Sequence, residues 1–286
     1  MRGKGYLALV PLVVILLLVE AYPLAYTFYL SFTDYATGNF VGAANYAQLL
    51  DIGYFGQAVA TSLAYALSAA ALALGIGVIL AFQVSILRRG KGMLESVLLA
   101  PLATAPIFAG ILWAPDGVWD DFNTFWHFVL GQPYFNPASS FFYFPVMILS
   151  DAWEWAPLIM LVSLGIMASV PPEVYEAAEV SGASRWQTFR SVSLPAILRS
   201  PVMQFVVVIR FVDAMRTFEV PFTWSTWVSL PQAGSPVDTV SLLLFKLFTV
   251  PLYNFPIGEI SAMAIALLAL TLGATTVLFS LLRRSR

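Results

Sequence analysis

The side chains best suited to chemistry in this sequence are ionisable groups inside strongly apolar stretches. A charge in such a place is costly unless it serves a site or pairs with another charge. Aromatic side chains stand beside these charges, and aromatic faces combined with a few hydrogen-bonding groups form binding sites for polar solutes. The candidates for such a site are Trp153, Glu154, Trp155, Arg210, Phe211 and Asp213.

A purely structural role explains some of the same residues. Trp153 and Trp155 are of the type that anchors a helix at a membrane interface. Arg210 and Asp213 are three residues apart, so they can pair on one face of a helix. The residue types alone leave both interpretations open.

Catalytic chemistry finds no support. The chain lacks G-x-x-x-x-G-K-[ST], G-x-S-x-G and H-E-x-x-H, so we expect neither an ATP-binding loop nor a hydrolase or zinc site. His127 is the only histidine and there is no cysteine. Asp116, Asp120 and Asp121 lack the spacing of a calcium loop and suit a solvated loop better. We therefore expect no enzyme, no catalytic residue, no metal site and no cofactor bound by this chain.

The elements that position these residues must lie in a membrane. Hydrophobic residues make up 59% of the 286, charged residues only 10%, and the mean hydropathy is +0.82. Such values indicate an integral membrane protein. The length allows about six spans of roughly 20 residues, and no soluble domain of ordinary size fits in the remainder. We predict an all-α fold with residues 1–286 forming one membrane domain, and no basic stripe suggests nucleic acid.

Six apolar stretches are the predicted spans. The first is interpreted as a retained anchor rather than a signal peptide, and Glu20 within it should face a protein interior or water. Residues 33–56, 115–140 and 224–256 are predicted loops. The spans are placed at about residues 6–32, 57–86, 93–114, 141–170, 201–223 and 257–282.

The distribution of Lys and Arg predicts the orientation. Of 14 such residues, eleven lie at the N-terminus, at 88–91, within 171–200 and in the C-terminal tail, whereas the loops at 33–56 and 115–140 have none. Six spans place the four basic regions on one side, and the positive-inside rule makes that side cytoplasmic. Both termini are therefore expected in the cytosol.

Residues 171–200 form the one long polar segment with its own folding signals. Pro171 and Pro172 can begin a helix, and Gly182 can end it as the glycine that follows a helix C-terminus. Three acids share one face of this helix: Glu173, Glu176 and Glu179. Such a helix is suited to meeting a partner in the cytosol.

A second short helix should follow. Ser184 with Gln187 three residues later has the pattern of a capping box. Trp186 and Phe189 then share a face. Leu194-Pro195 closes the segment and begins the next membrane helix.

This segment resembles the EAA loop of the membrane subunits of binding-protein-dependent ABC importers. The matched positions are Glu176, Ala177, Ala178, Gly182, Val192, Leu194 and Pro195. Ser181 departs from the aspartate usual in the carbohydrate branch. The resemblance implies a coupling role toward an ATPase for Glu173, Tyr175, Glu176, Ala177, Ala178, Glu179, Gly182 and Ala183. A generic amphipathic helix pair on the membrane surface is the alternative.

Other positions resemble the carbohydrate branch, the maltose- and glycerol-phosphate-type permeases. They are Phe40, Gly42, Asn45 and Tyr46, Trp153 and Pro157, the series Arg210, Asp213, Ala214, Arg216 and Phe218, and Gly258 with Ser261-Ala262. The stretch at 223–239 departs from the family pattern. By this resemblance the fourth and fifth spans line the solute pathway, and the cargo is a sugar or a sugar derivative.

The resemblance also implies an assembly in the cell membrane. Two permease subunits, expected to be non-identical, would enclose one pathway, with two cytosolic ATPase subunits that use ATP and magnesium and an extracytoplasmic solute-binding protein. The alternatives are an importer permease for a solute other than sugar, and a secondary transporter or channel that uses Glu20, Glu154, Arg210 and Asp213. A non-transport scaffold is disfavoured by the cost of intramembrane charges.

Overall fold

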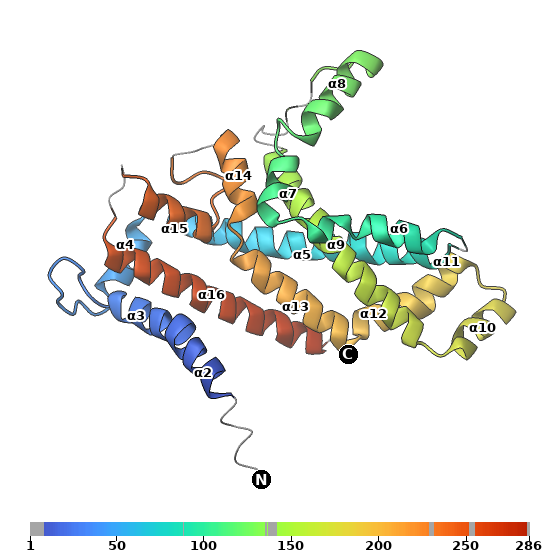
Figure 1. The fold of residues 1–286 in the computed structure, drawn as a ribbon, viewed down its shortest axis with the longest axis horizontal. Coiled ribbons are helices and arrows are strands. Elements are labelled where there is room, and N and C mark those ends of the chain that lie inside the picture. The colour runs from blue at the N-terminus through green and yellow to red at the C-terminus, as the bar shows by residue number, and fades with distance from the viewer. Residues whose placement is uncertain are drawn as a thin grey trace, which may run out of the picture.

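All regular structure in the described part of the chain is helical, which confirms the all-α class (Figure 1). The computed structural model describes residues 9–87, 89–134, 136, 142–228, 232–251 and 255–284. Within them the only β pairing is an isolated bridge between Thr33 and Phe40.

Four helical stretches are long and apolar enough to cross a membrane. The first, 10–30, consists of α2 (Val10–Leu16), the π-helical η1 (Leu17–Ala21) and α3 (Tyr22–Leu30). The others are single helices: α5 (Phe55–Ser85), α9 (Tyr143–Ser169) and α16 (Ile257–Arg284). At 1.5 Å per residue, each exceeds the roughly 30 Å hydrocarbon thickness or comes close to it.

Two further crossings are bent. The first joins α6 (Lys91–Leu98) and the 3-10 helix η2 (Ala100–Ala103) to α7 (Pro106–Leu112) with a bend of 101°. The second has a bend of 62°. Its elements are α11 (Arg185–Thr188), the π-helical η3 (Phe189–Ser193), α12 (Leu194–Arg199) and α13 (Pro201–Met215).

Proline causes both bends. Ala105 and Ser200 precede Pro106 and Pro201, and both are extended, with ψ of 142° and 128°, as the residue before a proline prefers. The predicted third span, 93–114, is thus interrupted at Thr104 and Ala105. The fifth ends at Met215 and not at residue 223. The count of six holds only if each bent pair is one span, and it stays a prediction.

Shorter helices occupy stretches that were predicted to be loops. They are α4 (Ala44–Asp51), α8 (Val118–Leu130) and α15 (Val240–Thr249), while α14 (Glu219–Val228) straddles the predicted end of span five. The prediction of a loop over 224–256 is therefore wrong for α15. Its buried face, which includes Leu243 and Leu247, packs with α5 and α16, and a helix of ten residues is too short for a span-based search to find.

The core forms along α5 and α9, which pack against each other over most of their length. Gly77 makes this contact close, since a Cβ there would lie 2.6 Å from Cβ of Ile159. Of the small residues on α5, Ala69 and Ala70 are also buried, whereas Ala71 and Gly75 are exposed. Small residues allow such approach in lipid, where apolar burial gives little driving force.

The stretch from Phe40 to Tyr46, which resembles the carbohydrate branch, has a structural role. Asn45 is buried and its Nδ2 donates to the carbonyls of Ser31 and Thr33, each at 3.0 Å. Gly258 at the start of α16 packs directly on Asn45 and would have no room for a side chain. Asn45 therefore joins the end of the first span to the beginning of the last.

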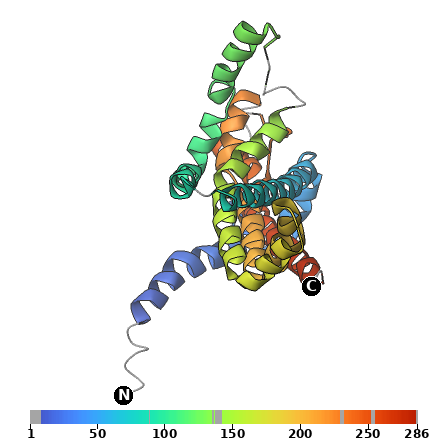
Figure 2. The same cartoon turned by 90° about the vertical axis from the view of Figure 1, so that its right-hand side faces the viewer.

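The first span and α8 extend away from the other helices (Figure 2). Every residue from 9 to 26 is exposed, including Glu20 in η1. Among the described residues, this chain provides no interior around Glu20. If Glu20 has the expected protein surroundings, another subunit must supply them.

Candidate functional site

Helix α10 (Pro172–Val180) ends as the sequence predicts. Gly182 has φ of +74°, its N–H donates to Glu179 O at 2.9 Å, and the N–H of Ala183 donates to Ala178 O at 3.0 Å. This pair of bonds is the Schellman motif, which satisfies carbonyls left free at a helix end. A Cβ on Gly182 would meet no described atom within 4 Å. The positive φ, and not a lack of space for a side chain, is therefore the reason that glycine suits this position.

The predicted capping box is confirmed. Ser184 Oγ accepts from the N–H of Gln187 at 3.3 Å, and the N–H of Ser184 donates to Gln187 Oε1 at 2.7 Å. Trp186 and Phe189 stack at 5.5 Å between ring centroids, and both contact Phe82 near the end of α5. Thus the second half of the 171–200 segment is held on a membrane helix by aromatic packing.

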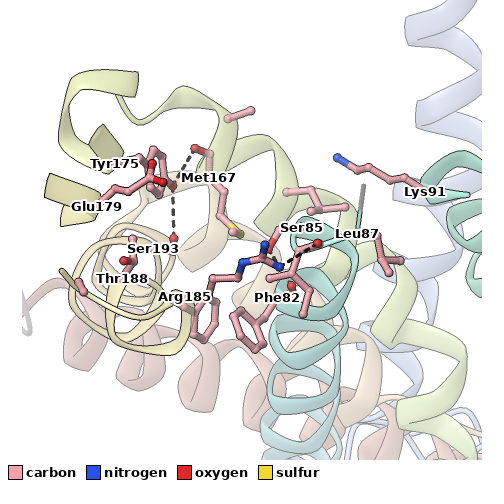
Figure 3. A pocket seen from close by; sticks show the side chains of 15 residues that line it. Phe82, Ser85, Leu87, Lys91, Met167, Tyr175, Glu179, Arg185, Thr188 and Ser193 are labelled. Atoms are coloured by element: carbon pink, nitrogen blue, oxygen red, sulfur yellow. Dashed lines mark hydrogen bonds between the residues drawn. The ribbon is translucent and has the colours of Figure 1, made fainter. Parts of the chain in front are cut away.

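Tyr175 joins α10 to the membrane helices. Its hydroxyl donates to Met167 O near the end of α9 at 3.1 Å and lies 3.3 Å from Ser193 Oγ in η3 (Figure 3). Arg185 donates to the carbonyl of Ile86, the residue that caps the C-terminus of α5. These bonds surround a cleft of about 630 Å³ between α5, α9 and the 171–200 segment.

The remainder of α10 faces outward. No residue of α10, all of which are described, is buried, and Val180 is 90% exposed. The predicted coupling residues separate into two groups. Tyr175, Ala178 and Ala183 are half-buried, and the exposed ones are Glu173, Glu176, Ala177, Glu179 and Gly182.

The intramembrane charges form one cluster around Arg210. Its side chain is fully buried. Nη2 pairs with Asp151 Oδ2 and Nη1 with Asp213 Oδ2, the latter at 3.1 Å. The guanidinium also lies 4.9 Å from the centre of the Trp155 ring, in cation–π contact. The predicted Arg210–Asp213 pair exists, but the buried partner of Arg210 is Asp151 on α9.

A cavity of about 350 Å³ opens beside this cluster. Its lining comes from α7, α9, the end of α13, the link 216–218 and the start of α14. The residues are Pro106, Asp151, Glu154, Trp155, Asp213, Arg216, Thr217, Phe218 and Glu219. The break between η2 and α7 and the break between α13 and α14 both meet here. Irregular backbone at membrane depth is tolerated only where protein buries it or a watery cavity borders it.

The free carbonyls at the end of α13 are satisfied by the segment before and within α15. Thr239 Oγ1 donates to Thr217 O at 3.2 Å, and Ser241 Oγ donates to Arg216 O at 3.1 Å. A buried ion pair, Lys246 Nζ to Asp238 Oδ1 at 2.7 Å, holds that segment. The segment from Asp238 to Lys246 thus supports the wall of the cavity.

Not all six predicted pathway residues line this cavity. Glu154, Trp155 and Asp213 do, and Arg210 lies behind Asp151 and Asp213. Trp153 contacts Trp113 at 6.0 Å between centroids. Phe211 is 2% exposed and packs in the core with Tyr65 and Trp224.

Three charged lining residues were absent from the predicted set: Asp151, Arg216 and Glu219. Asp151 lies three and four residues before Glu154 and Trp155, so a helical face argument identifies it, and the same argument places Trp153 on another face. Glu219 follows the break between α13 and α14, and residue types alone do not predict where such a break falls. Across the described ranges, no cluster of three His, Cys, Asp or Glu could hold a metal.

The fold and these sites define a multi-pass transport protein of the membrane. Residues 73–285 match the family described as "Binding-protein-dependent transport system inner membrane component", and the chain belongs to this family. The family is one of membrane components of transport systems.

Curated relatives span nearly the whole chain. The trehalose/maltose transport system permease protein MalF of Thermococcus litoralis is 28% identical over 283 residues, covering 96% of this chain and 91% of the relative. The sn-glycerol-3-phosphate transport system permease protein UgpA of Yersinia pseudotuberculosis is 26% identical over 252 residues, covering 87% and 82%.

Solved structures share the fold. A chain of a bacterial ABC transporter that imports the acidic polysaccharide alginate aligns with a TM-score of 0.80 at 20% identity, over 98% of this chain and 95% of the other. A chain of the alginate transporter in complex with a pentasaccharide-bound periplasmic protein gives 0.76 at 19% identity, over 95% and 92%.

Proposed function

We propose that this chain is the permease subunit of an ATP-driven importer and that residues 171–200 transmit the movement of separate ATPase subunits to its membrane helices. The observation that carries this proposal is α10. It is closed by a Schellman motif, exposed along its outer face, and tied through Tyr175 to both α9 and η3. A force on α10 would therefore reach two membrane helices at once.

The partners follow from the family. Its members are binding-protein-dependent, so an extracytoplasmic solute-binding protein would deliver the solute. Two ATPase subunits would bind ATP and magnesium, and this chain would bind neither. A second permease, different from this one, would complete the pathway. The complex of the alginate transporter with its periplasmic protein supports the solute-binding protein in this arrangement.

The orientation follows from the basic residues. The cleft below α10, the segment 171–200 and both termini would lie in the cytosol, and the loop at 33–43 would lie outside. ATP-driven closure of the ATPases would then switch the membrane helices between states open to either side.

The cargo we propose is a carbohydrate. Relatives named for trehalose, maltose and glycerol phosphate support this class. Within this chain, Trp155 and Phe218 line the cavity together with the carboxylates of Glu154 and Asp213. Aromatic faces can contact the apolar face of a sugar ring while carboxylates accept hydrogen bonds from its hydroxyls.

Charge reversal on α10 tests the coupling role. Glu176→Lys should reduce co-purification of the ATPase with a tagged permease, and solute-stimulated ATP hydrolysis should fall with it. Glu179→Gln, which removes one charge at another exposed acid, should have the smaller effect. Monodisperse permease in both variants is the control for folding. Wild-type ATPase association and hydrolysis in both would contradict the assignment of α10.

A further inference from the structure

We propose that the cavity between α7, α9, α13 and α14 selects solutes by charge: it admits neutral or positively charged carbohydrates and excludes acidic ones. This inference rests on the proposed function, because it names the class of sugar that the same site would accept. It matters within the family, since relatives are named for both neutral sugars and an anionic glycerol phosphate.

The first step is the charge of the walls. Four carboxylates line the cavity, those of Asp151, Glu154, Asp213 and Glu219, against one cation, Arg216. The buried Arg210 behind the wall pairs with Asp151 and Asp213. With Arg210 included, four formal negative charges face two positive ones. An anionic solute would meet this excess where solvent screening is weak.

The second step is an acceptor that lacks a donor. Glu154 is 8% exposed, and its Oε2 has no hydrogen-bond partner among the described residues. Buried polar atoms without partners are uncommon, and each calls for an explanation. A carboxylate oxygen can accept hydrogen bonds only. Oε2 is itself shielded from solvent, so its charge adds to the negative potential of the wall, which disfavours a phosphate or a second carboxylate and not a sugar hydroxyl or an ammonium group.

The third step concerns shape. The volume of about 350 Å³ lies at the small end of the range for ligand pockets, about 300–1,000 Å³. Trp155 offers one ring face to Arg210 and also lines the cavity, and Phe218 lines it from the link between α13 and α14. The cavity therefore combines aromatic side chains with hydrogen-bond acceptors, and one of the two basic groups, Arg210, is paired with Asp151 and Asp213.

Charged thiol reagents test this selectivity directly, because the chain has no cysteine of its own. The variant Thr217→Cys places one thiol at the cavity. It would be studied in the complete transporter, with any partner cysteines replaced, in lipid nanodiscs that leave both faces accessible. The rate of modification by a cationic methanethiosulfonate is divided by the rate for an anionic one. The same ratio at the exposed Thr37→Cys is the reference.

We expect the ratio at Thr217→Cys to exceed the reference at least tenfold, and Glu154→Gln with Glu219→Gln to lower it. Glucose or glucosamine should slow the modification, and glucuronate or glycerol 3-phosphate should not. If Thr217→Cys reacts with neither reagent, Phe218→Cys at the next lining residue supplies the measurement.

Several results would overturn the proposal: a ratio equal to the reference, no modification at either position, no protection by glucose or glucosamine, or protection by glucuronate at the same concentration as glucose. None of them bears on ATPase association. A failure of charge selection is thus distinct from a failure of the proposed coupling function, which is measured by co-purification.

Discussion

At the scale of single residues, Arg210 determines the charge balance of the membrane core. A fully buried guanidinium is tolerated because two carboxylates and an aromatic ring surround it. Burial of an ion pair costs desolvation free energy, so such a pair adds little net stability, but removal of one partner leaves an uncompensated charge. The stability of the protein should therefore fall more when one member of a pair is replaced than when both are replaced by apolar residues.

We predict that Arg210→Ala lowers the free energy of unfolding by about 3–5 kcal/mol, because Asp151 loses its buried partner. Denaturation in mixed micelles is the measurement. Asp213→Asn is the matched comparison: the Asp213 side chain is 40% exposed and Arg210 keeps its buried partner Asp151, so the loss of stability should be smaller. The double variant Arg210→Met with Asp151→Leu should be more stable than Arg210→Ala. Equal stability of Arg210→Ala and the wild type would refute the structural role of the pair.

At the scale of helices, the ends and breaks shape the two candidate sites. The Schellman motif at Gly182 and the capping box at Ser184 fix the angle between α10 and α11. The breaks at Pro106 and after Met215 open the cavity. Each of these features depends on residues that are close in sequence. Each sets the direction of a helix that ends at a candidate site.

Gly182 allows a sharp prediction about α10. A non-glycine residue in the left-handed region costs about 1–2 kcal/mol, with asparagine tolerated best and β-branched residues least. A loss of 1.4 kcal/mol is about tenfold in affinity. We expect Gly182→Val to weaken ATPase binding at least about tenfold and Gly182→Asn to remain close to the wild type, measured by titration of purified ATPase. Equal affinities for the two variants would mean that the left-handed turn does not position α10.

At the scale of the whole molecule, α10 and α11 lie at one end of the long helices, while α4 lies at the other (Figure 1). In the N-terminal span α3 contacts α16, but α2, η1 and α3, all of which are described, contain no buried residue. A membrane subunit with such an exposed span is suited to assembly with a second subunit.

The orientation can be tested with single cysteines in this cysteine-free chain. In right-side-out membrane vesicles, a membrane-impermeant maleimide should label the exposed Thr37→Cys at once. It should label the exposed Arg190→Cys only after permeabilisation. Both positions are exposed, so burial does not bias the comparison. The reverse pattern would place α10 outside the cell, where no ATPase could reach it.

Several features were determined by the sequence alone, because they depend on neighbours within one or two turns of helix. Composition identified a membrane protein. Gly182 ends α10 and the capping box at Ser184 begins α11, and both features appear as predicted. The Arg210–Asp213 pair also follows from a spacing of three residues.

Only the tertiary structure decided the rest, because the relevant partners are distant in sequence. Asp151 meets Arg210 across 59 residues, and Asn45 braces α3 against α16. The helix breaks bring Glu219 to the same cavity as Glu154. Phe211, on α13, packs in the core. Residue type marked the intramembrane charges as functional candidates, but the packing of α7, α9, α13 and α14 determined which of them share a site.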